Sequence, residues 1–186
     1  PARQGAPMSE TLIAPHPLDH AVRLEPVEPG LYRGATTPEY WNMAGPFGGA
    51  TAAIMLKAVL DHPERRGRPV AQTVNFCAAV AEGPFDVAVR LVRDGRSTQH
   101  WQVELSQGGK IATTSSAVTG AERETWTHTP GAPPQVPPAE QTPVLDTTGR
   151  NGWRARYEFR YVRGAPMPGG GSAEAPASAV SQTWIR

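Results

Sequence analysis

The sequence predicts an α+β fold in which a long antiparallel sheet wraps around one central, buried helix. One observation is a helix expected over residues 49–61, which is apolar on nearly every face and must therefore be buried on most sides. The other is a series of segments in which apolar and polar residues alternate, as is typical of half-buried strands. Because one helix precedes several antiparallel strands, we expect it to lie on one face of their sheet.

Composition limits the classes of function. The chain has 186 residues, enough for one domain or for one domain and part of another. A net charge of +1 predicts no strong attraction to nucleic acid or to an anionic membrane. Cys77 is the only cysteine, so an intrachain disulfide and a cysteine metal cage are excluded, and no metal site is expected. Without an apolar signal core or a run of transmembrane length, a cytoplasmic protein is expected.

An arm and a strand are expected before the helix. Residues 1–29 are rich in proline and lack periodicity, which predicts a loosely structured arm. His16 and His20 have the spacing of helical metal ligands, but the neighbouring prolines are expected to interrupt any helix there. A strand is predicted from Gly30 to Asn42, and a proline and a glycine stop the helix after residue 61.

Four strands are expected after the helix. Their alternating residues place them at about residues 70–80, 85–91, 100–105 and 110–119. The dipeptides Asp94-Gly95 and Gly108-Gly109 stand between the last three, and such pairs favour tight type I′ or II′ hairpin turns. The segments together predict an antiparallel meander.

The composition changes after residue 125. A proline-rich stretch over 126–152 predicts an extended linker. Aromatic residues then alternate with arginines over 153–163, which predicts a strand. Residues 164–177 are expected to form a loop, and residues 180–186 are expected to form another strand. Two strands without a helix make a poor domain, so we expect this segment to pack on the first part of the chain or on further chain.

The alternating arginines and aromatics at 153–163 also suggest stacking on nucleic-acid bases. A half-buried strand needs the same alternation, however, and the net charge is close to zero. No nucleic-acid partner is therefore expected.

The turn Gly45-Pro46-Phe47-Gly48-Gly49, with the buried helix and the meander behind it, resembles the hotdog fold. In detail the turn resembles the first half of the double-hotdog acyl-CoA thioesterases of the type II class, in which a linker joins two hotdog repeats. Gly95-Arg96-Ser97 is similar to a short segment of that family, and Gln182–Arg186 resembles the strand before the second repeat's helix. The resemblance implies a first hotdog repeat over 30–125 and the opening strands of a second, incomplete repeat over 153–186.

The resemblance also implies a reaction, the hydrolysis of acyl-CoA thioesters by activated water, with no cofactor. It places the catalytic carboxylate and its Thr and Gln partners in the second repeat, with the carboxylate on that repeat's helix, beyond Arg186. No acid stands in the first turns of the helix at 49–61, and Asp61 lies about 18 Å along it. The catalytic residues are therefore unknown in this chain. The expected partners are an acyl-CoA substrate and a second hotdog repeat or another copy of the chain.

The glycine turn contains the candidates for substrate binding, namely Asn42, Phe47, Gly48 and Gly49. Backbone amides at a helix start can stabilise the oxyanion of a thioester, and glycine lets a ligand approach them closely. The same glycines can instead serve tight helix–strand packing, and Asn42 can be a local cap. The alternative function is a non-catalytic hotdog module for acyl-chain binding or assembly. A hotdog dehydratase would need a histidine and an acid at the helix start, and neither stands there.

Overall fold

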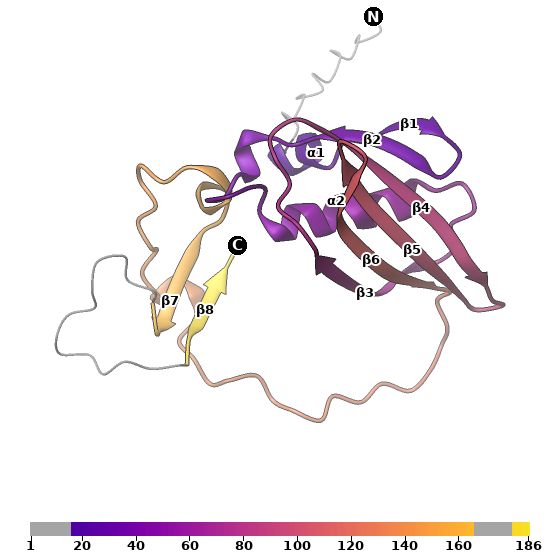
Figure 1. The fold of residues 1–186 in the computed structure, drawn as a ribbon. Coiled ribbons are helices and arrows are strands. Elements are labelled where there is room, and N and C mark those ends of the chain that lie inside the picture. The colour runs from indigo at the N-terminus through magenta and orange to yellow at the C-terminus, as the bar shows by residue number, and fades with distance from the viewer. Residues whose placement is uncertain (1–15, 166–179) are drawn as a thin grey trace, which may run out of the picture.

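The computed structural model describes residues 16–165 and 180–186, and shows a curved sheet with a helix along it (Figure 1). Most of the loop predicted over 164–177 lies outside these residues. The helices are α1 (Pro17–Ala21) and α2 (Gly48–Asp61), with short 3-10 helices η1 (Pro38–Tyr40), η2 (Ala139–Gln141) and η3 (Gly152–Arg156). The strands are β1 (Glu25–Glu28), β2 (Leu31–Ala35), β3 (Arg68–Phe76), β4 (Pro84–Asp94), β5 (Thr98–Gln107), β6 (Lys110–Gly120), β7 (Phe159–Arg163) and β8 (Gln182–Ile185). In these described ranges no helix is long and apolar enough to cross a membrane.

Six of the strands form one antiparallel sheet in the order β1-β2-β4-β5-β6-β3. The predicted meander is confirmed for β4, β5 and β6, which pair in succession. Strand β3 pairs with β6 instead of with β4, because β2 and β5 occupy both sides of β4. The sheet therefore has β1 at one edge and β3 at the other.

The two predicted hairpins form with different turns. Gly108 and Gly109 both have positive φ, 57° and 75°, as a type I′ turn between β5 and β6 requires. Gly95 does not have positive φ, so the expected primed turn is wrong at that position. Its amide donates to the Thr98 carbonyl oxygen at 2.9 Å, and a Cβ there would lie 2.7 Å from the same oxygen. Glycine is needed there because a side chain would collide with the Thr98 carbonyl oxygen, and not because the backbone has a positive φ.

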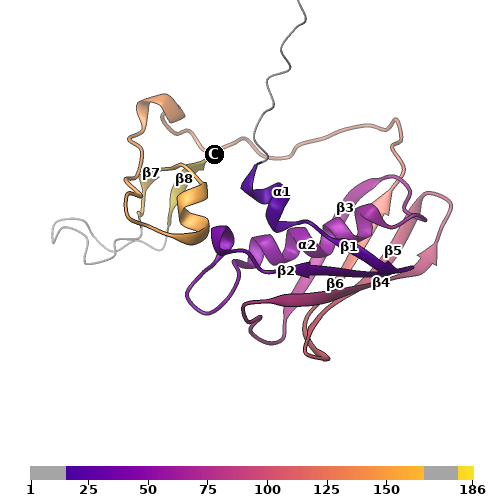
Figure 2. The same ribbon diagram turned by 90° about the horizontal axis from the view of Figure 1, so that it is seen from above.

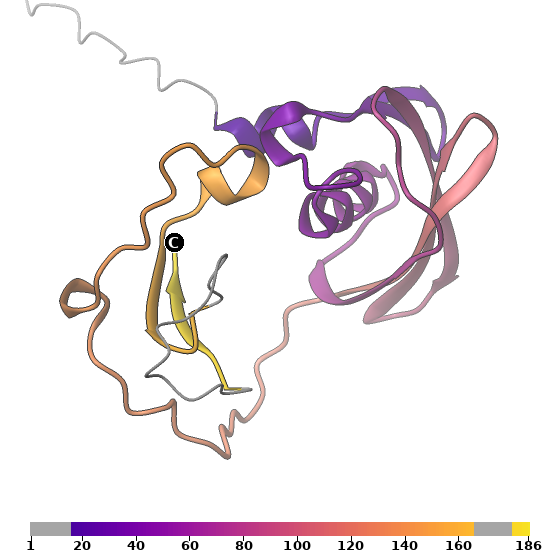
Figure 3. The same ribbon diagram turned by 60° about the vertical axis from the view of Figure 1, so that its left-hand side comes forward.

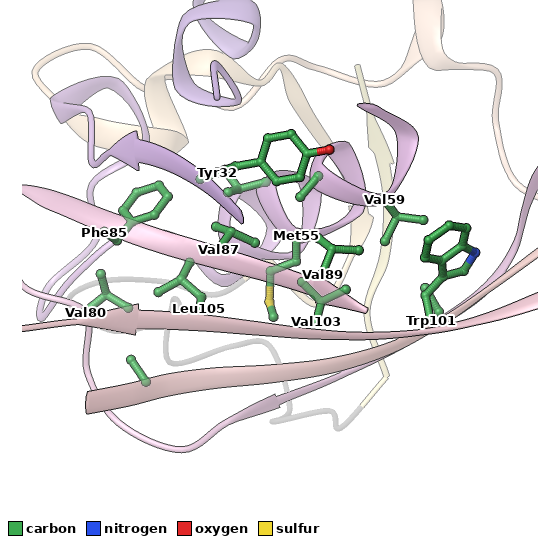
Figure 4. Packing of buried hydrophobic residues seen from close by; sticks show 14 residues of the cluster. Tyr32, Met55, Val59, Val80, Phe85, Val87, Val89, Trp101, Val103 and Leu105 are labelled. Atoms are coloured by element: carbon green, nitrogen blue, oxygen red, sulfur yellow. The ribbon is translucent and has the colours of Figure 1, made fainter. Parts of the chain in front are cut away.

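Helix α2 lies against the concave side of the sheet, as Figure 3 shows nearly end-on. Its inner face packs into the core drawn in Figure 4, where the fully buried side chains include Met55, Val59, Trp101 and Val103. Full burial of each such aliphatic side chain contributes about 1.5–3 kcal/mol. The expected burial on most sides is wrong for the outer face, because the sheet covers only one side of the helix. The partly exposed residues of that face include Ala52, Ala53, Leu56 and Leu60.

The segment before Gly30 is more ordered than the expected arm over 1–29. Helix α1 forms where the prolines were expected to prevent one: Pro17 stands at its first position, where a missing N–H group is harmless. His16 caps this helix in a reciprocal pair with Asp19. Strand β1 then adds an edge to the sheet, a position at which Pro26 is tolerated. The strand predicted from Gly30 to Asn42 ends early, at Ala35.

The C-terminal segment forms a separate two-stranded sheet of β7 and β8 (Figure 1). The strand predicted over 153–163 is correct for β7 but wrong for residues 152–156, which form η3. Trp153 and Tyr157 both pack around Tyr40. Over so few residues the same sequence fits a strand or a short 3-10 turn, so alternation did not separate the two structures. Seen from above, η3 lies beside η1, so this segment packs on the first part of the chain (Figure 2).

Candidate functional site

The glycine turn between η1 and α2 is closed by backbone hydrogen bonds. The amide of Asn42 donates to the Gly45 carbonyl oxygen at 2.7 Å, and the amide of Phe47 donates to that of Tyr40 at 2.7 Å. A Cβ at Gly45 would lie 2.8 Å from the Val80 carbonyl oxygen, so the loop packs directly on the segment after β3. Burial raises the pKa of Tyr40, which keeps its phenol neutral. The backbone at the start of α2 is thus held in a defined position.

Helix α2 begins with two uncapped N–H groups. Its N-cap residue, Phe47, makes no side-chain cap, and its carbonyl oxygen accepts from the amides of Ala50 at 2.9 Å and Thr51 at 3.2 Å. The amides of Gly48 and Gly49 have no hydrogen-bond partner among the described residues. The helix dipole adds positive potential at this end, which favours a carbonyl, carboxylate or phosphate oxygen.

A pocket of about 480 Å³ lies in front of this helix start. The glycine turn, the first turn of α2, the segment after β3 and strand β6 supply its walls. Thr113 of β6 is fully buried, and its hydroxyl group has no hydrogen-bond partner in the described part of the chain. An unsatisfied buried hydroxyl group costs about 1–3 kcal/mol, which a bound polar group would recover. The pocket is therefore lined both by apolar residues and by the helix start and Thr113.

The structure divides the four predicted site residues into two pairs. Asn42 and Gly48 line the pocket. Phe47 does not; its ring stacks on Trp153 at 4.4 Å between ring centres. Gly49 also lies outside the lining, and a Cβ there would approach Phe47 Cε1 to 2.5 Å. Binding of substrate by any of the four stays a prediction, with Asn42 and Gly48 placed to contact a ligand and Gly49 placed to accommodate the aromatic stack.

Sequence reasoning missed the contribution of β6. Thr113 and Ser115 alternate at inward positions of this strand, and both are fully buried. Ser115 Oγ accepts from the Gln72 amide at 3.3 Å, whereas Thr113 has no partner among the described residues. Hydroxyl groups at the buried, inward positions of this strand were the available signal. Thr51 and Cys77, which also line the pocket, carry no distinct sequence pattern.

The pocket contains no carboxylate to activate water. Asp61 lies at the far end of α2 and pairs with Lys57 at 2.5 Å, so it cannot act at the glycine turn. Cys77 lines the pocket but is exposed. Within the described ranges no group of three or more acidic, histidine or cysteine side chains could hold a metal ion. These residues can bind and polarise a carbonyl group but supply no general base.

Comparison with known proteins agrees with this geometry. Residues 37–120, which include the glycine turn, α2 and β3 to β6, match the model of the acyl-CoA thioesterase N-terminal domain. A hot dog-fold protein of unknown function from Alicyclobacillus acidocaldarius is 42% identical, with a TM-score of 0.78 over 82% of this chain and 57% of that one. The hotdog fold expected from the sequence is thereby confirmed. No curated protein matches the chain.

A more distant similarity extends to a thioesterase structure. Acyl-CoA thioesterase II TesB2 from Mycobacterium marinum is 24% identical, with a TM-score of 0.68 over 91% of this chain and 59% of that one. At this identity the likeness shows the fold alone. The chain spans 57% of the Alicyclobacillus protein and 59% of the mycobacterial one, less than two thirds of either.

Proposed function

We propose that this hotdog-fold chain, whose residues 37–120 match the acyl-CoA thioesterase N-terminal domain, is a thioesterase II-like protein and that its pocket at the start of α2 binds the thioester group of an acyl-CoA. One observation carries the proposal: the uncapped amide of Gly48 and the unpaired, buried hydroxyl group of Thr113 line the same pocket. Preorganised donors of this kind stabilise the oxyanion that forms when a thioester is attacked.

The reaction proposed is hydrolysis by water. A carboxylate takes a proton from the water, whose oxygen attacks the thioester carbonyl carbon. The carbonyl oxygen becomes an oxyanion held by the Gly48 amide and the Thr113 hydroxyl group. The carbon–sulfur bond then breaks as the protonated carboxyl group returns its proton to the leaving sulfur, which releases the fatty or aryl acid and the CoA thiol. Because the pocket lining has no carboxylate, we place the acid in a second hotdog repeat.

The partner that supplies this acid is a second repeat or another copy of the chain. Strand β3 leaves one edge of the sheet unpaired among the described residues, and its Val70 and Phe76 are 67% and 58% exposed. The outer face of α2 is also partly exposed and apolar. An unpaired strand edge beside an apolar surface favours association. A cytoplasmic location belongs to the same proposal.

The test is the release of free thiol from short, long and aryl acyl-CoAs, with the chain as given and with the chain joined to a second repeat. We expect hydrolysis only when the second repeat is present, and at least about tenfold loss in Thr113→Val, since one oxyanion donor contributes about 10²–10³-fold. The lack of hydrolysis by the joined form with every substrate would reject the thioesterase proposal. Binding of acyl-CoA without hydrolysis would favour the alternative of a non-catalytic module, which the missing carboxylate supports.

A further inference from the structure

A groove beside the glycine turn connects the first part of the chain to its C-terminal segment. It has a volume of about 400 Å³, and it is lined by Pro38 of η1, by residues 41–43 and by residues 150–154. Asn42 lines both this groove and the pocket at the start of α2. The two spaces therefore adjoin, so one extended ligand can occupy both.

The lining of the groove has two cations and no carboxylate. The charged residues in it are Arg150 and Arg154, and neither belongs to a salt bridge within the described ranges. Arg150 does act on Asp146 nearby. However, hydrogen bonds from Thr148 are the main cause of the lowered pKa of that carboxyl group, and the charge of Arg150 is the weakest cause. Both guanidinium groups thus remain available to an anionic ligand.

Aromatic and backbone contacts hold the groove in shape. Trp153 stacks on Phe47 at 4.4 Å, and Arg154 Cζ lies 5.5 Å from the centre of the Trp153 ring in a cation–π contact. Gly152 has a positive φ of 69°, and a Cβ there would collide with the Trp41 carbonyl oxygen. That oxygen accepts from the Trp153 amide at 3.3 Å. The Arg154 guanidinium group and the Trp153 ring are therefore positioned before any ligand arrives.

We propose that this groove binds the phosphorylated nucleotide end of acyl-CoA, with Arg150 and Arg154 on its phosphates and the indole of Trp41 against its base. The inference rests on the proposed function, which places the thioester in the adjoining pocket. Guanidinium groups pair bidentately with phosphate oxygens and also stack on planar rings. A free acyl chain would use neither cation, whereas acyl-CoA carries both phosphates and a planar base.

The test is a calorimetric titration of residues 1–186 with CoA, 3′-phosphoadenosine 5′-phosphate and pantetheine. The variant R150Q/R154Q removes both cations from the groove. R156Q/R163Q is the control, since it removes the same charge from the same segment but from residues outside the lining. We expect CoA and the nucleotide to bind the unaltered chain and the control about equally. The groove variant should lose roughly tenfold affinity for each arginine, as expected for charge-assisted hydrogen bonds, and pantetheine binding should not change.

Each alternative outcome has a definite meaning. Equal CoA binding by R150Q/R154Q and the unaltered chain, both with native circular dichroism, would overturn the inference. Failure of the unaltered chain to bind CoA would also overturn it, as would tighter, arginine-dependent binding of single-stranded RNA than of CoA. Partial recovery of affinity in R150K/R154K, which keeps charge but loses the planar fork, would support it. Because these measurements need no hydrolysis, a chain that binds CoA through the arginines but never releases thiol would reject only the thioesterase proposal.

Discussion

At the scale of single residues, polar groups without partners mark the site. The hydroxyl group of Thr113 is buried and unpaired among the described residues, whereas that of Thr119, on the same face of the same strand, is fully paired. Thr119 Oγ1 accepts from Trp101 Nε1 at 3.1 Å and donates to Gln99 Oε1 at 3.3 Å. Two threonines of similar burial thus differ in energy: the paired Thr119 stabilises the fold, whereas the unpaired Thr113 is the one proposed to bind a ligand.

This contrast predicts opposite effects on stability for the same substitution. Thr113→Val should leave the free energy of unfolding unchanged or raise it by up to about 1–3 kcal/mol, because it removes an unsatisfied buried hydroxyl group. Thr119→Val should lower it by about 1–3 kcal/mol, because it leaves Trp101 and Gln99 without their partner. Urea denaturation of both variants measures the difference. A destabilisation of equal size in both would contradict the assignment of Thr113 to ligand binding.

The two glycines at the start of α2 are expected to differ in the same way. Gly48→Ala places a Cβ 3.0 Å from the ring of Phe76, which is exposed and can move. It should weaken binding of a non-hydrolysable acyl-CoA analogue that keeps the carbonyl group by about tenfold, because the added methyl group hinders close approach to the amide, with little change in stability. Gly49→Ala should do the reverse: its Cβ meets the Phe47 ring, so unfolding should become easier by roughly 1–3 kcal/mol. Calorimetry and thermal unfolding separate the two results, and loss of binding in Gly49→Ala alone would be inconsistent with the placement of these residues.

At the scale of elements, one polar network ties the end of α2 to the β4–β5 hairpin. Gln99 Oε1 accepts from the Arg66 amide at 2.6 Å, and its Nε2 donates to the Glu64 carbonyl oxygen at 2.9 Å and to Asp94 Oδ1 at 3.1 Å. The guanidinium group of Arg66 also pairs with Asp94. Hydrogen bonds from Arg66 and then Gln99 hold the pKa of Asp94 below its usual range.

The lowered pKa predicts a pH-dependent contribution of Asp94 to stability. A carboxyl group with a depressed folded-state pKa stabilises the fold above its unfolded-state pKa, and this contribution is lost as pH falls through the folded-state value. Asp94→Asn should therefore be less stable than the unaltered chain at pH 7, and the gap should close in acid, below the usual carboxyl range. Denaturation from pH 7 to pH 2, with Glu122→Gln from the exposed pair with Arg68 as control, provides the comparison. A gap that stays constant over this range would show that the network does not depend on the charge of Asp94.

At the scale of the whole molecule, the β3 edge of the sheet carries the exposed apolar residues Val70 and Phe76. The opposite edge, β1, has four exposed residues and two glutamates. The double variant Val70→Lys/Phe76→Lys should therefore abolish association through β3, either between copies or with a second repeat. Val27→Lys, on β1, is the control because Val27 is also about half exposed. Sedimentation velocity measures the result, and equal association of both variants would exclude the β3 edge as the interface.

Much of the fold could be predicted because it follows from short-range patterns. The α2 helix, the strands β3 to β6 and the Gly108-Gly109 turn each result from the periodicity or backbone freedom of neighbouring residues. The same reasoning failed where one pattern suits two structures, as at η3, or where a proline stands at the first position of a helix, as at α1.

By itself, the sequence determined that one apolar helix follows a glycine turn and that antiparallel strands cover it. Only the tertiary structure decided that β3 pairs with β6, that Thr113 lies unpaired beside Gly48, and that the arginines at 150 and 154 border the same turn. The reason is physical: local propensities depend on adjacent residues, whereas a binding site depends on which distant segments the packing of the sheet and helix brings together.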